Sequence, residues 1–292
     1  MPEPVILVAG SLHYDIMVEA DRLPRRDETA VGRLWYPKFG GKGGNQAVAA
    51  AAQGVPVRFL GAVGGDDFGR FLRAGLEAAG VDVRFLREVP GTGSGMSVAV
   101  QDGAGDYAAT IVSGANLGIG PGWLAEAPLW EGVGLLVLQN EVPEVVNLAA
   151  AGAARARGAR VILNAAPFRP LAEGLAALVD VLVVNAVEAE MMGAGAVTDL
   201  DGAAAAAGRI AGGFGAVIVT AGAAGLAARL ADGTGFALPA ERVGVVSSHG
   251  AGDAFVGALA AALAVGSRLA DGARAASRAA ARHVAGLSTR PA

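Results

Sequence analysis

The chain has 292 residues, of which 53% are hydrophobic and 17% charged, with a net charge of −4 and no cysteine. This apolar content is sufficient for a large core and excludes a disordered chain. Without cysteine there are no disulfides, thiolate nucleophiles or thiolate zinc sites, and the acidic balance without a basic stripe disfavours nucleic-acid binding.

Short apolar runs rich in β-branched residues alternate along the chain with alanine-rich stretches typical of helices. In chain order we expect strands at residues 5–9, 57–63, 135–138, 161–163, 181–184 and 217–219, and helices at 44–53, 68–79, 145–157, 203–211 and 252–265. The strand segments are apolar throughout, as parallel strands covered on both faces are. The alternation predicts an α/β fold with a doubly wound, mostly parallel sheet flanked by helices.

Shorter segments with alternating polarity interrupt this pattern. They are Asp15–Ala20 paired with 30–39, and Met96–Gln101 paired with 106–112. The sequence Asp102-Gly103-Ala104-Gly105 is a hairpin signal between the last two. We therefore expect a small antiparallel β lid.

The lid is expected to consist of insertions at about residues 13–40 and 95–113 in a single domain spanning 1–292. One of its faces carries Trp35 and Phe39, so that face needs a cover. The sequence contains neither a fixed-period repeat nor a separate linker, so it does not indicate a second domain.

Targeting and membrane signals are missing from the sequence. The amino terminus has no basic segment, and the apolar run Val5–Ala9 is too short for a signal peptide. The longest apolar stretch, Ala254–Gly266, is shorter than the roughly 20 residues that span a bilayer. We expect a soluble, cytoplasmic protein with neither a membrane nor a nucleic acid as partner.

Polar residues follow the predicted strands at the edge where open α/β sheets bind ligands. These residues are Ser11, Asp15, Asp66, Asn140, Glu141, Asn164, Asn185, Glu188 and Thr220. Each one alone could simply cap a strand or open a loop. Together they indicate a ligand site on this edge.

The most specific local signal is Ser247-Ser248-His249-Gly250-Ala251-Gly252-Asp253, directly before an apolar helix. Small residues at 250–252 let backbone N–H groups converge at a helix N-terminus, which favours an anion. Asp253 beside a bound phosphate could accept the proton of an attacking hydroxyl. On these residues alone, an Asp that stabilises the first helical turn is an equal alternative.

A second glycine-rich segment, Gly40-Gly41-Lys42-Gly43-Gly44-Asn45-Gln46, opens the next helix. Lys42 and Asn45 could hydrogen-bond ligand hydroxyls, although a plain connection with a solvated lysine is the alternative. The segment is not a Walker A loop, because no Ser or Thr follows the lysine. The chain also lacks G-x-G-x-x-G and G-x-S-x-G, which disfavours a dinucleotide-dependent oxidoreductase and an α/β hydrolase.

Over nearly the whole chain, these motifs in this order resemble the ribokinase-like (PfkB) family of sugar and nucleoside kinases. The resemblance is carried by Gly10-Ser11 with Asp15, Gly40–Asn45, Gly61–Gly64 with Asp66 and Gly69, Asn185–Glu188, Thr220–Gly222 with Gly225, and Gly250–Asp253. It implies a ribokinase-like fold and ATP-dependent phosphorylation of a hydroxyl, usually the hydroxymethyl group of a small sugar.

The resemblance also implies a role for individual positions. Asp253 would be the catalytic base, and the backbone N–H groups of Gly250, Ala251 and Gly252 would form the anion hole. Asn185 and Glu188 would organise Mg²⁺ through water. The ATP contacts would come from Asn185, Thr220, Gly222 and Gly225, and the acceptor contacts from Asp15, Gly41, Lys42, Asn45 and Glu141. The lid would exclude water, and because it forms a dimer in several members, we expect a homodimer.

Some positions depart from the family pattern. Ser247-Ser248 stands where many members have Asp-Thr, and that Asp helps bind an activating monovalent cation. The chain stops at Ala292, shortly after Ser288-Thr289-Arg290, where ribokinases supply further cation ligands, so we expect weak or absent K⁺ activation. His13 stands where ribokinases have an Asn that contacts ribose, which leaves the acceptor open. His249 could sense phosphate charge or be an ordinary loop histidine.

Other functions stay open at this point. A nucleoside kinase of the same family would need a base pocket in the lid, for which Trp35, Tyr36 and Tyr107 are candidates. A sugar-phosphate acceptor would need more basic residues near Lys42, such as Arg33 or Lys38. A non-catalytic sugar-binding regulator is the alternative from another class, and the intact Asp253, Asn185 and Glu188 argue against it.

Overall fold

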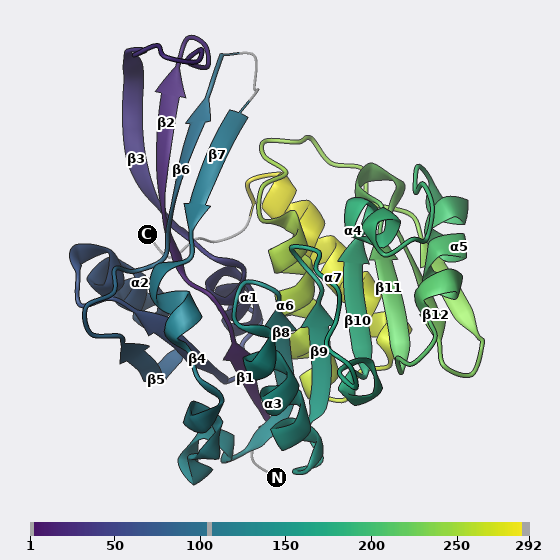
Figure 1. The fold of residues 1–292 in the computed structure, drawn as a ribbon. Helices are drawn as coiled ribbons and strands as arrows, with labels where there is room; N and C mark the ends of the chain where they lie inside the picture. Colours follow the sequence, from purple (N-terminus) through teal and green to yellow (C-terminus); the bar gives the residue numbers. More distant parts are fainter. Residues whose placement is uncertain (1–2, 104–106, 288–292) are drawn as a thin grey trace.

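The computed structural model describes residues 3–103 and 107–287, and these form a large sheet, a small sheet and flanking helices (Figure 1). The large sheet has nine strands in the order β13-β12-β11-β10-β9-β8-β1-β4-β5. Its strands are β1 (Val5–Ala9), β4 (Val57–Val63), β5 (Asp82–Glu88), β8 (Val133–Gln139), β9 (Arg160–Asn164), β10 (Val181–Asn185), β11 (Ala216–Thr220), β12 (Leu226–Leu230) and β13 (Gly235–Leu238). All neighbours from β5 to β11 pair in parallel, and β12 and β13 add antiparallel strands at one edge.

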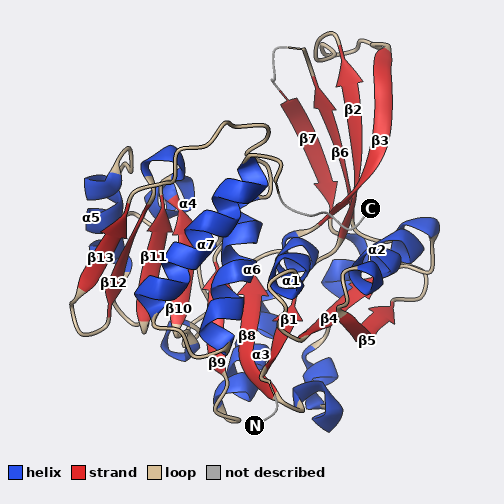
Figure 2. Ribbon diagram, turned by 180° about the vertical axis from the view of Figure 1, so that it is seen from behind, coloured by secondary structure: helices blue, strands red, loops and turns tan. Residues whose placement is uncertain are grey.

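Helices cover both faces of the large sheet (Figure 2). One face carries α1 (Lys42–Ala51), α2 (Asp67–Ala78), α6 (Ala251–Ala264) and α7 (Leu269–Val284). The other carries α3 (Glu144–Arg155), α4 (Ala186–Met191) and α5 (Leu200–Ile210). Short 3₁₀ helices lie at Gly114–Gly118, Pro121–Ala125, Ala127–Trp130, Ala176–Leu178 and Gly222–Ala224. Within the described ranges, no helix has the length and apolar character needed to cross a membrane.

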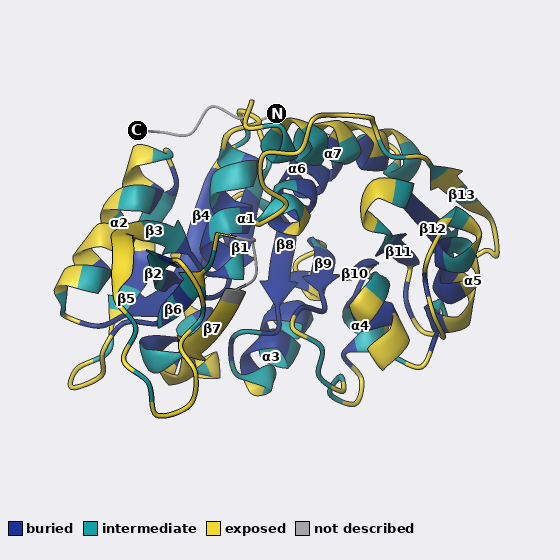
Figure 3. Ribbon diagram, turned by 90° about the horizontal axis from the view of Figure 1, so that it is seen from above, coloured by how far each residue is buried: buried dark blue, intermediate teal, exposed yellow. Residues whose placement is uncertain are grey.

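The core follows from the sequence pattern of the strands. Ile6, Leu7 and Val8 of β1 point alternately to opposite faces, and all three are fully buried. Seen from above, the central strands are dark blue while the outer sides of the helices are exposed (Figure 3). A strand with apolar side chains on both faces is therefore stable only inside this three-layer arrangement.

Helices α1 and α6 pack very closely because small residues face each other. A Cβ atom added at Gly257 of α6 would lie 2.6 Å from the backbone oxygen of Gln46 and from the Cβ of Ala49, both on α1. Only glycine fits such an approach. The contact brings the first turns of α1 and α6 side by side, and both turns begin at the carboxyl edge of the sheet.

The small sheet projects from the large one and contains β2 (His13–Ala20), β3 (Gly32–Gly40), β6 (Met96–Gln101) and β7 (Tyr107–Val112), in the order β3-β2-β6-β7. Pairing is antiparallel within β2–β3 and within β6–β7, as expected for a lid, whereas the central pair β2–β6 is parallel. The parallel pair arises because each hairpin enters from the same edge of the large sheet. Part of the turn predicted at Asp102–Gly105, with Asp106, lies outside the described residues, as does Ser288-Thr289-Arg290.

Aromatic contacts fix the base of the small sheet to the body. The Tyr14 ring of β2 stacks on Phe68 of α2 with ring centroids 4.0 Å apart, and it meets the edge of Phe71 at 4.9 Å. Farther out, the strands are exposed, and the Trp35 side chain of β3 is 62% accessible (Figure 3). The small sheet is thus anchored at one end and free at the other.

Candidate active site

The candidate site lies at the carboxyl edge of the large sheet, where the strand order reverses. Within the large sheet, β4 and β5 lie on one side of β1, whereas β8 and β9, which come later in the chain, lie on its other side. Such a reversal leaves a crevice between β1 and β8, which is where open α/β sheets bind ligands. Ser11 follows β1 and Glu141 follows β8, so both flank this crevice.

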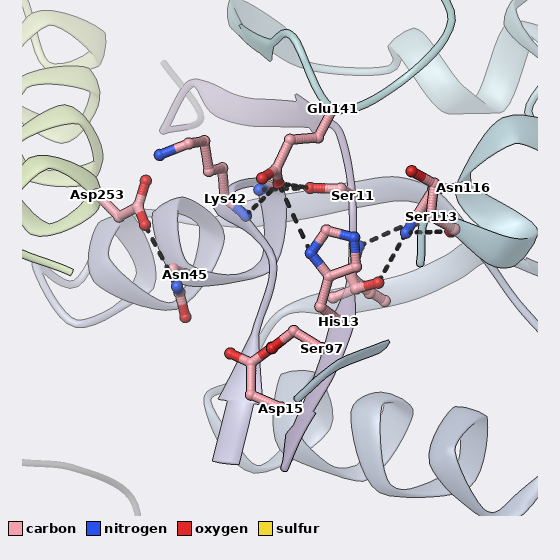
Figure 4. Close-up of polar contacts among 12 residues, drawn as sticks. Ser11, His13, Asp15, Lys42, Asn45, Ser97, Ser113, Asn116, Glu141 and Asp253 are labelled. Carbon is pink, nitrogen blue, oxygen red and sulfur yellow. Dashed lines mark hydrogen bonds and ion pairs between the residues drawn. The ribbon is translucent and has the colours of Figure 1, made fainter. Parts of the chain in front are cut away.

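Asp253 lies in the first turn of α6 and is 7% exposed. The Nε2 of Gln46 donates to Asp253 Oδ1 at 2.9 Å. The Nδ2 of Asn45 donates to Oδ2 at 3.3 Å, as Figure 4 shows. Burial raises the pKa of the Asp253 carboxyl, and the nearby Lys42 ammonium opposes that increase. A carboxylate held by neutral amides instead of an arginine is oriented while remaining basic.

The N-terminus of α6 lies directly beside this carboxylate. Gly250 caps the helix in the left-handed conformation, with φ 83°, and no side chain caps the helix N-terminus. The first N–H groups of an α-helix have no intrahelical partner, and the helix dipole is positive there. The N–H of Ala251 donates to the carbonyl oxygen of Ser248 at 3.2 Å, and Gly250 and Gly252 lie beside it at this positive end of the helix, next to Asp253.

Glu141 organises one end of the crevice. Its Oε2 accepts a hydrogen bond from Ser11 Oγ at 2.5 Å and from the backbone N–H of Lys42 at 2.9 Å. The Nδ1 of the buried His13 lies 3.9 Å from the same oxygen (Figure 4). Gly41, the N-cap of α1, precedes Lys42 at this contact.

Asp15 of β2 supplies a second buried carboxyl at this end. Ser97 of β6 donates its Oγ–H to Asp15 Oδ1 at 2.6 Å, across the parallel pair of the small sheet. Burial raises the pKa of Asp15, and the hydrogen bond from Ser97 partly offsets that effect. Lys38 is the residue opposite Asp15 on β3, so it lies on the same face of the small sheet.

Arg169 holds the loop that carries Glu141. Its Nη1 donates to the carbonyl oxygen of Val142 at 2.7 Å and to that of Asn140 at 3.4 Å, on either side of Glu141. The Nη2 atom is buried without a hydrogen-bond partner, and burial lowers the pKa of this guanidinium. The Arg169 guanidinium therefore fixes the backbone on both sides of Glu141.

The opposite end of the site is formed by Asn185 and Glu188. The two residues make a capping box at the start of α4, in which Asn185 Oδ1 accepts from the N–H of Glu188 at 2.9 Å, and Glu188 Oε2 accepts from the N–H of Asn185 at 2.8 Å. Burial raises the pKa of Glu188, and the negative charge of Asp253 contributes in the same direction. A small cavity of about 50 Å³ lies between them, Lys42, Thr220 and Asp253.

Most of the predicted site residues come together around this crevice. Gathered there are Asp15, Gly41, Lys42, Asn45, Glu141, Asn185, Glu188, Thr220 and the segment Gly250–Asp253. Gly222 and Gly225 lie farther out, in the turn between β11 and β12, beyond Thr220. A larger groove of about 590 Å³ leads from Asn45 and Asp253 between α1, α2 and α7.

Several contacts at the site were missed by sequence reasoning. Gln46, Ser97, Arg169 and His13 all touch predicted site residues, but only His13 was singled out beforehand. Gln46 belongs to the glycine-rich segment Gly40–Gln46, and its place next to Asn45 is the sequence feature that indicates a role at the site. Ser97 and Arg169 carry no local signal, because their partners lie far away in the sequence.

A doubly wound sheet with a projecting small sheet, and a buried carboxylate beside a helix N-terminus at the switch point, are the features of a small-molecule kinase. Comparison with known families agrees. The pfkB family carbohydrate kinase pattern matches residues 5–291. The chain belongs to this family.

Individual relatives are ribokinases and deoxyribokinases. The chain is 36% identical to the ribokinase of Bacillus subtilis over 167 residues (57% of each protein), and 32% identical to that of Arabidopsis thaliana over 190 residues (63% of this chain and 50% of the relative). It therefore spans about half the length of these two curated relatives. The deoxyribokinase of Salmonella typhimurium is 32% identical over 257 residues, covering 87% of this chain and 84% of the relative.

The fold is similar to a solved structure over nearly its whole length. Arabidopsis thaliana ribokinase in complex with ribose and ATP superimposes with a TM-score of 0.89 and 29% identity, covering 99% of this chain and 95% of the other. The predicted ribokinase-like fold is confirmed by this likeness.

Proposed function

We propose that this protein transfers the γ-phosphoryl group of ATP to a hydroxyl, most simply a hydroxymethyl group, of a small sugar. The observation that carries the proposal is the Asp253 carboxylate, buried beside the N-terminus of α6 and oriented by Gln46 and Asn45. Family membership and the ribokinase and deoxyribokinase relatives support a sugar as the acceptor.

In the proposed reaction, Asp253 accepts the proton of the acceptor hydroxyl as its oxygen bonds to the γ-phosphorus. The bond from that phosphorus to the bridging oxygen of ADP breaks, leaving a sugar phosphate and ADP. The N–H groups of Gly250, Ala251 and Gly252 stabilise the charge on the transferring group. The raised pKa of Asp253 makes it a better proton acceptor than an ordinary carboxylate.

The sugar is held at the other end of the crevice. Asp15 and Glu141 accept hydrogen bonds from its hydroxyls, while Lys42, Asn45 and the backbone of Gly41 donate to it. Both carboxyls are already fixed by Ser97 and Ser11, which means that they need no reorganisation when the sugar binds. The small sheet acts as the lid that covers the acceptor and excludes water.

ATP binds with its phosphates between the α6 N-terminus and α4, and Thr220, Gly222 and Gly225 contact the nucleotide. The oxygens of Asn185 and Glu188 suit Mg²⁺, which prefers oxygen ligands and retains several waters. Among the described residues, no three His, Asp or Glu side chains are grouped to hold a metal. Asn185 and Glu188 would therefore hold the ion jointly with the phosphates, whose charge it neutralises when bound.

The strand register divides the aromatic residues of β3 between the two faces of the lid. Side chains alternate between the two faces of a strand, and Lys38 of β3 shares the face of Asp15. Trp35 is an odd number of residues from Lys38, so it lies on the opposite face, whereas Tyr36 is two residues from Lys38 and shares the face of Asp15. Tyr36 is therefore the aromatic residue of β3 that would contact the base of a nucleoside acceptor. The side chain of Tyr107 lies outside what the structure describes.

Two finer features belong to the same proposal. We propose a homodimer formed through the lid, and K⁺ activation that is weak or absent because Ser247 replaces an acidic ligand. Initial rates in matched Na⁺ and K⁺ buffers test the second feature, and a many-fold gain in K⁺ would contradict it.

The proposed function is tested by measuring ADP release from MgATP against free sugars, sugar phosphates and nucleosides. We expect turnover with one or more free pentoses or hexoses and identification of the sugar phosphate by mass spectrometry. Turnover confined to nucleosides would instead identify a nucleoside kinase, and turnover confined to sugar phosphates would place Lys38 at a second phosphate.

A further inference from the structure

The loop that leads into α6 is held by the C-terminal end of α7. The backbone N–H groups of Val246 and Ser247 donate to the carbonyl oxygen of Val284 at 2.8 and 3.2 Å. One residue earlier on α7, the Nε2 of His283 donates to the carbonyl oxygen of His249 at 2.9 Å. The loop itself is exposed from Val243 to His249, so core packing does not fix it and these hydrogen bonds carry its orientation.

The His283 contact acts on the peptide that opens the anion hole. The peptide between His249 and Gly250 is planar and trans, so its carbonyl and its N–H point in opposite directions. Because the carbonyl is directed to α7, the N–H of Gly250 is directed away from α7. Gly250 is required here, since its φ is 83° and an added Cβ would lie 3.0 Å from His283 Nε2.

We propose that His283 is a positioning residue for the anion hole, which it orients by donating a hydrogen bond to the His249 carbonyl. The inference rests on the proposed function, in which the N–H of Gly250 contacts the transferring phosphoryl group. His283 lines the groove beside Gly250 and Asp253, and the role proposed here is exerted through the His249 carbonyl. The donor exists both in the imidazolium and in the neutral tautomer with its proton on Nε2.

The role predicts an effect on the rate of phosphoryl transfer and not on substrate binding. His283→Leu removes the donor, whereas His283→Gln keeps an N–H donor at a similar reach. We expect His283→Leu to lower kcat roughly 10-fold, since misaligned donors stabilise the transition state less. The KM values for sugar and ATP and the thermal midpoint should stay unchanged, and His283→Gln should retain most of the wild-type kcat.

A neighbouring position serves as the matched control. Arg282 lies on the same last turn of α7 and is exposed. Arg282→Gln should leave kcat, both KM values and the thermal midpoint at wild-type levels. If His283→Leu keeps the wild-type kcat, or if His283→Gln falls as far as His283→Leu, the proposed positioning role is wrong.

A second readout does not depend on the acceptor. ADP with aluminium fluoride mimics the planar transferring phosphoryl group, and its affinity can be measured by calorimetry in the presence of Mg²⁺. We expect His283→Leu to weaken this complex roughly 10-fold relative to ADP alone, and His283→Gln to restore it. Equal affinity in wild type and His283→Leu would overturn the role of His283. If the wild-type protein phosphorylates no sugar, the proposed function fails, while this binding comparison still decides the role of His283.

Discussion

At the scale of the residue, one buried carboxyl group connects stability with catalysis. Asp253 has Gln46 and Asn45 as hydrogen-bond donors, and burial raises its pKa. A raised pKa means that the folded state binds the proton more tightly than the unfolded state does. The stability that Asp253 contributes is therefore complete below its unfolded pKa and is lost as the pH rises through its folded pKa.

This linkage predicts that Asp253→Asn makes the protein more stable at pH 8. The neutral amide avoids the cost of a buried charge, and Asn45 can present its oxygen to the new amide by rotating its own. We expect a rise in Tm of roughly 2–4 °C, the effect of about 1 kcal/mol in a large domain. In calorimetry the difference from wild type should shrink toward pH 4; an Asp253→Asn protein that melts below wild type at pH 8 would show that Asp253 stabilises the fold.

At the scale of the element, the site depends on how closely the elements approach one another. Gly257 lets α6 contact α1, and that contact places Asp253 against Gln46 and Asn45. At the other end, Arg169 connects the segment after β9 to the loop after β8, which carries Glu141. Both contacts join segments distant in the sequence, so each orients a proposed catalytic or binding group from outside its own element.

The Arg169 contact predicts a selective loss of acceptor affinity. Arg169→Leu removes the hydrogen bonds that flank Glu141, so the Glu141 loop is no longer fixed. We expect the KM for the sugar to rise about fivefold, the effect of about 1 kcal/mol of lost hydrogen bonding, with the KM for ATP unchanged.

The control for Arg169 is a hydrogen-bonded arginine at the opposite edge of the sheet. Arg155 of α3 donates to Asp180 at 2.7 Å, just before β10 begins. Arg155→Leu should leave both KM values unchanged. An unchanged sugar KM in Arg169→Leu, or an equal rise in both variants, would contradict the positioning of Glu141 by Arg169.

Much of the element order could be predicted from the sequence. The apolar runs predicted both ends of β1 and β4 correctly, and the ends of β8, β9, β10 and β11 within one or two residues. These strands are covered on both faces, so their sequences are apolar throughout and differ clearly from those of solvent-exposed segments. Strands β5, β12 and β13 were missed: β5 and β13 are the two edge strands and alternate apolar with charged or exposed positions, and Arg229 interrupts the apolar run of β12. Helices α4 and α7 were also missed, because α4 is only six residues long and α7 interrupts its alanines with charged residues such as Arg274 and Arg278.

The candidate site was predictable only in part, and the reason is sequence distance. Gly250–Asp253 and Gly40–Asn45 are contiguous motifs that carry their own signal. The hydrogen bond from Gln46 to Asp253 joins residues 207 positions apart, and that from Ser97 to Asp15 joins residues 82 apart. No local pattern specifies such pairs, because packing of the helices and lid strands creates them.

At the scale of the whole molecule, the lid leaves an apolar surface that a second copy can cover. Trp35 of β3 is opposite Val18 of β2, on the face away from Asp15, and Trp35 is 62% exposed. A compact protein seldom leaves such a face uncovered. The proposed lid dimer buries this face without blocking the acceptor site on the other.

The dimer predicts a particular mass in solution and a particular variant that changes it. Light scattering after size exclusion should give twice the chain mass of 28.8 kDa. Trp35→Glu, which places a charge in the proposed interface, should convert the protein to monomers with the fold intact by circular dichroism. A wild-type protein that is monomeric at all concentrations would contradict the lid dimer.

The central claim, that Asp253 accepts the proton of a sugar hydroxyl during phosphoryl transfer, is tested most directly by the turnover of Asp253→Asn. ADP release would be measured with MgATP and the sugar found active with the wild-type protein, alongside the affinity for ADP. The account predicts a fall in kcat on the order of 10²-fold or more, with ADP affinity unchanged. An Asp253→Asn protein with nearly wild-type kcat would contradict it, because the buried carboxylate would then take no part in the chemistry.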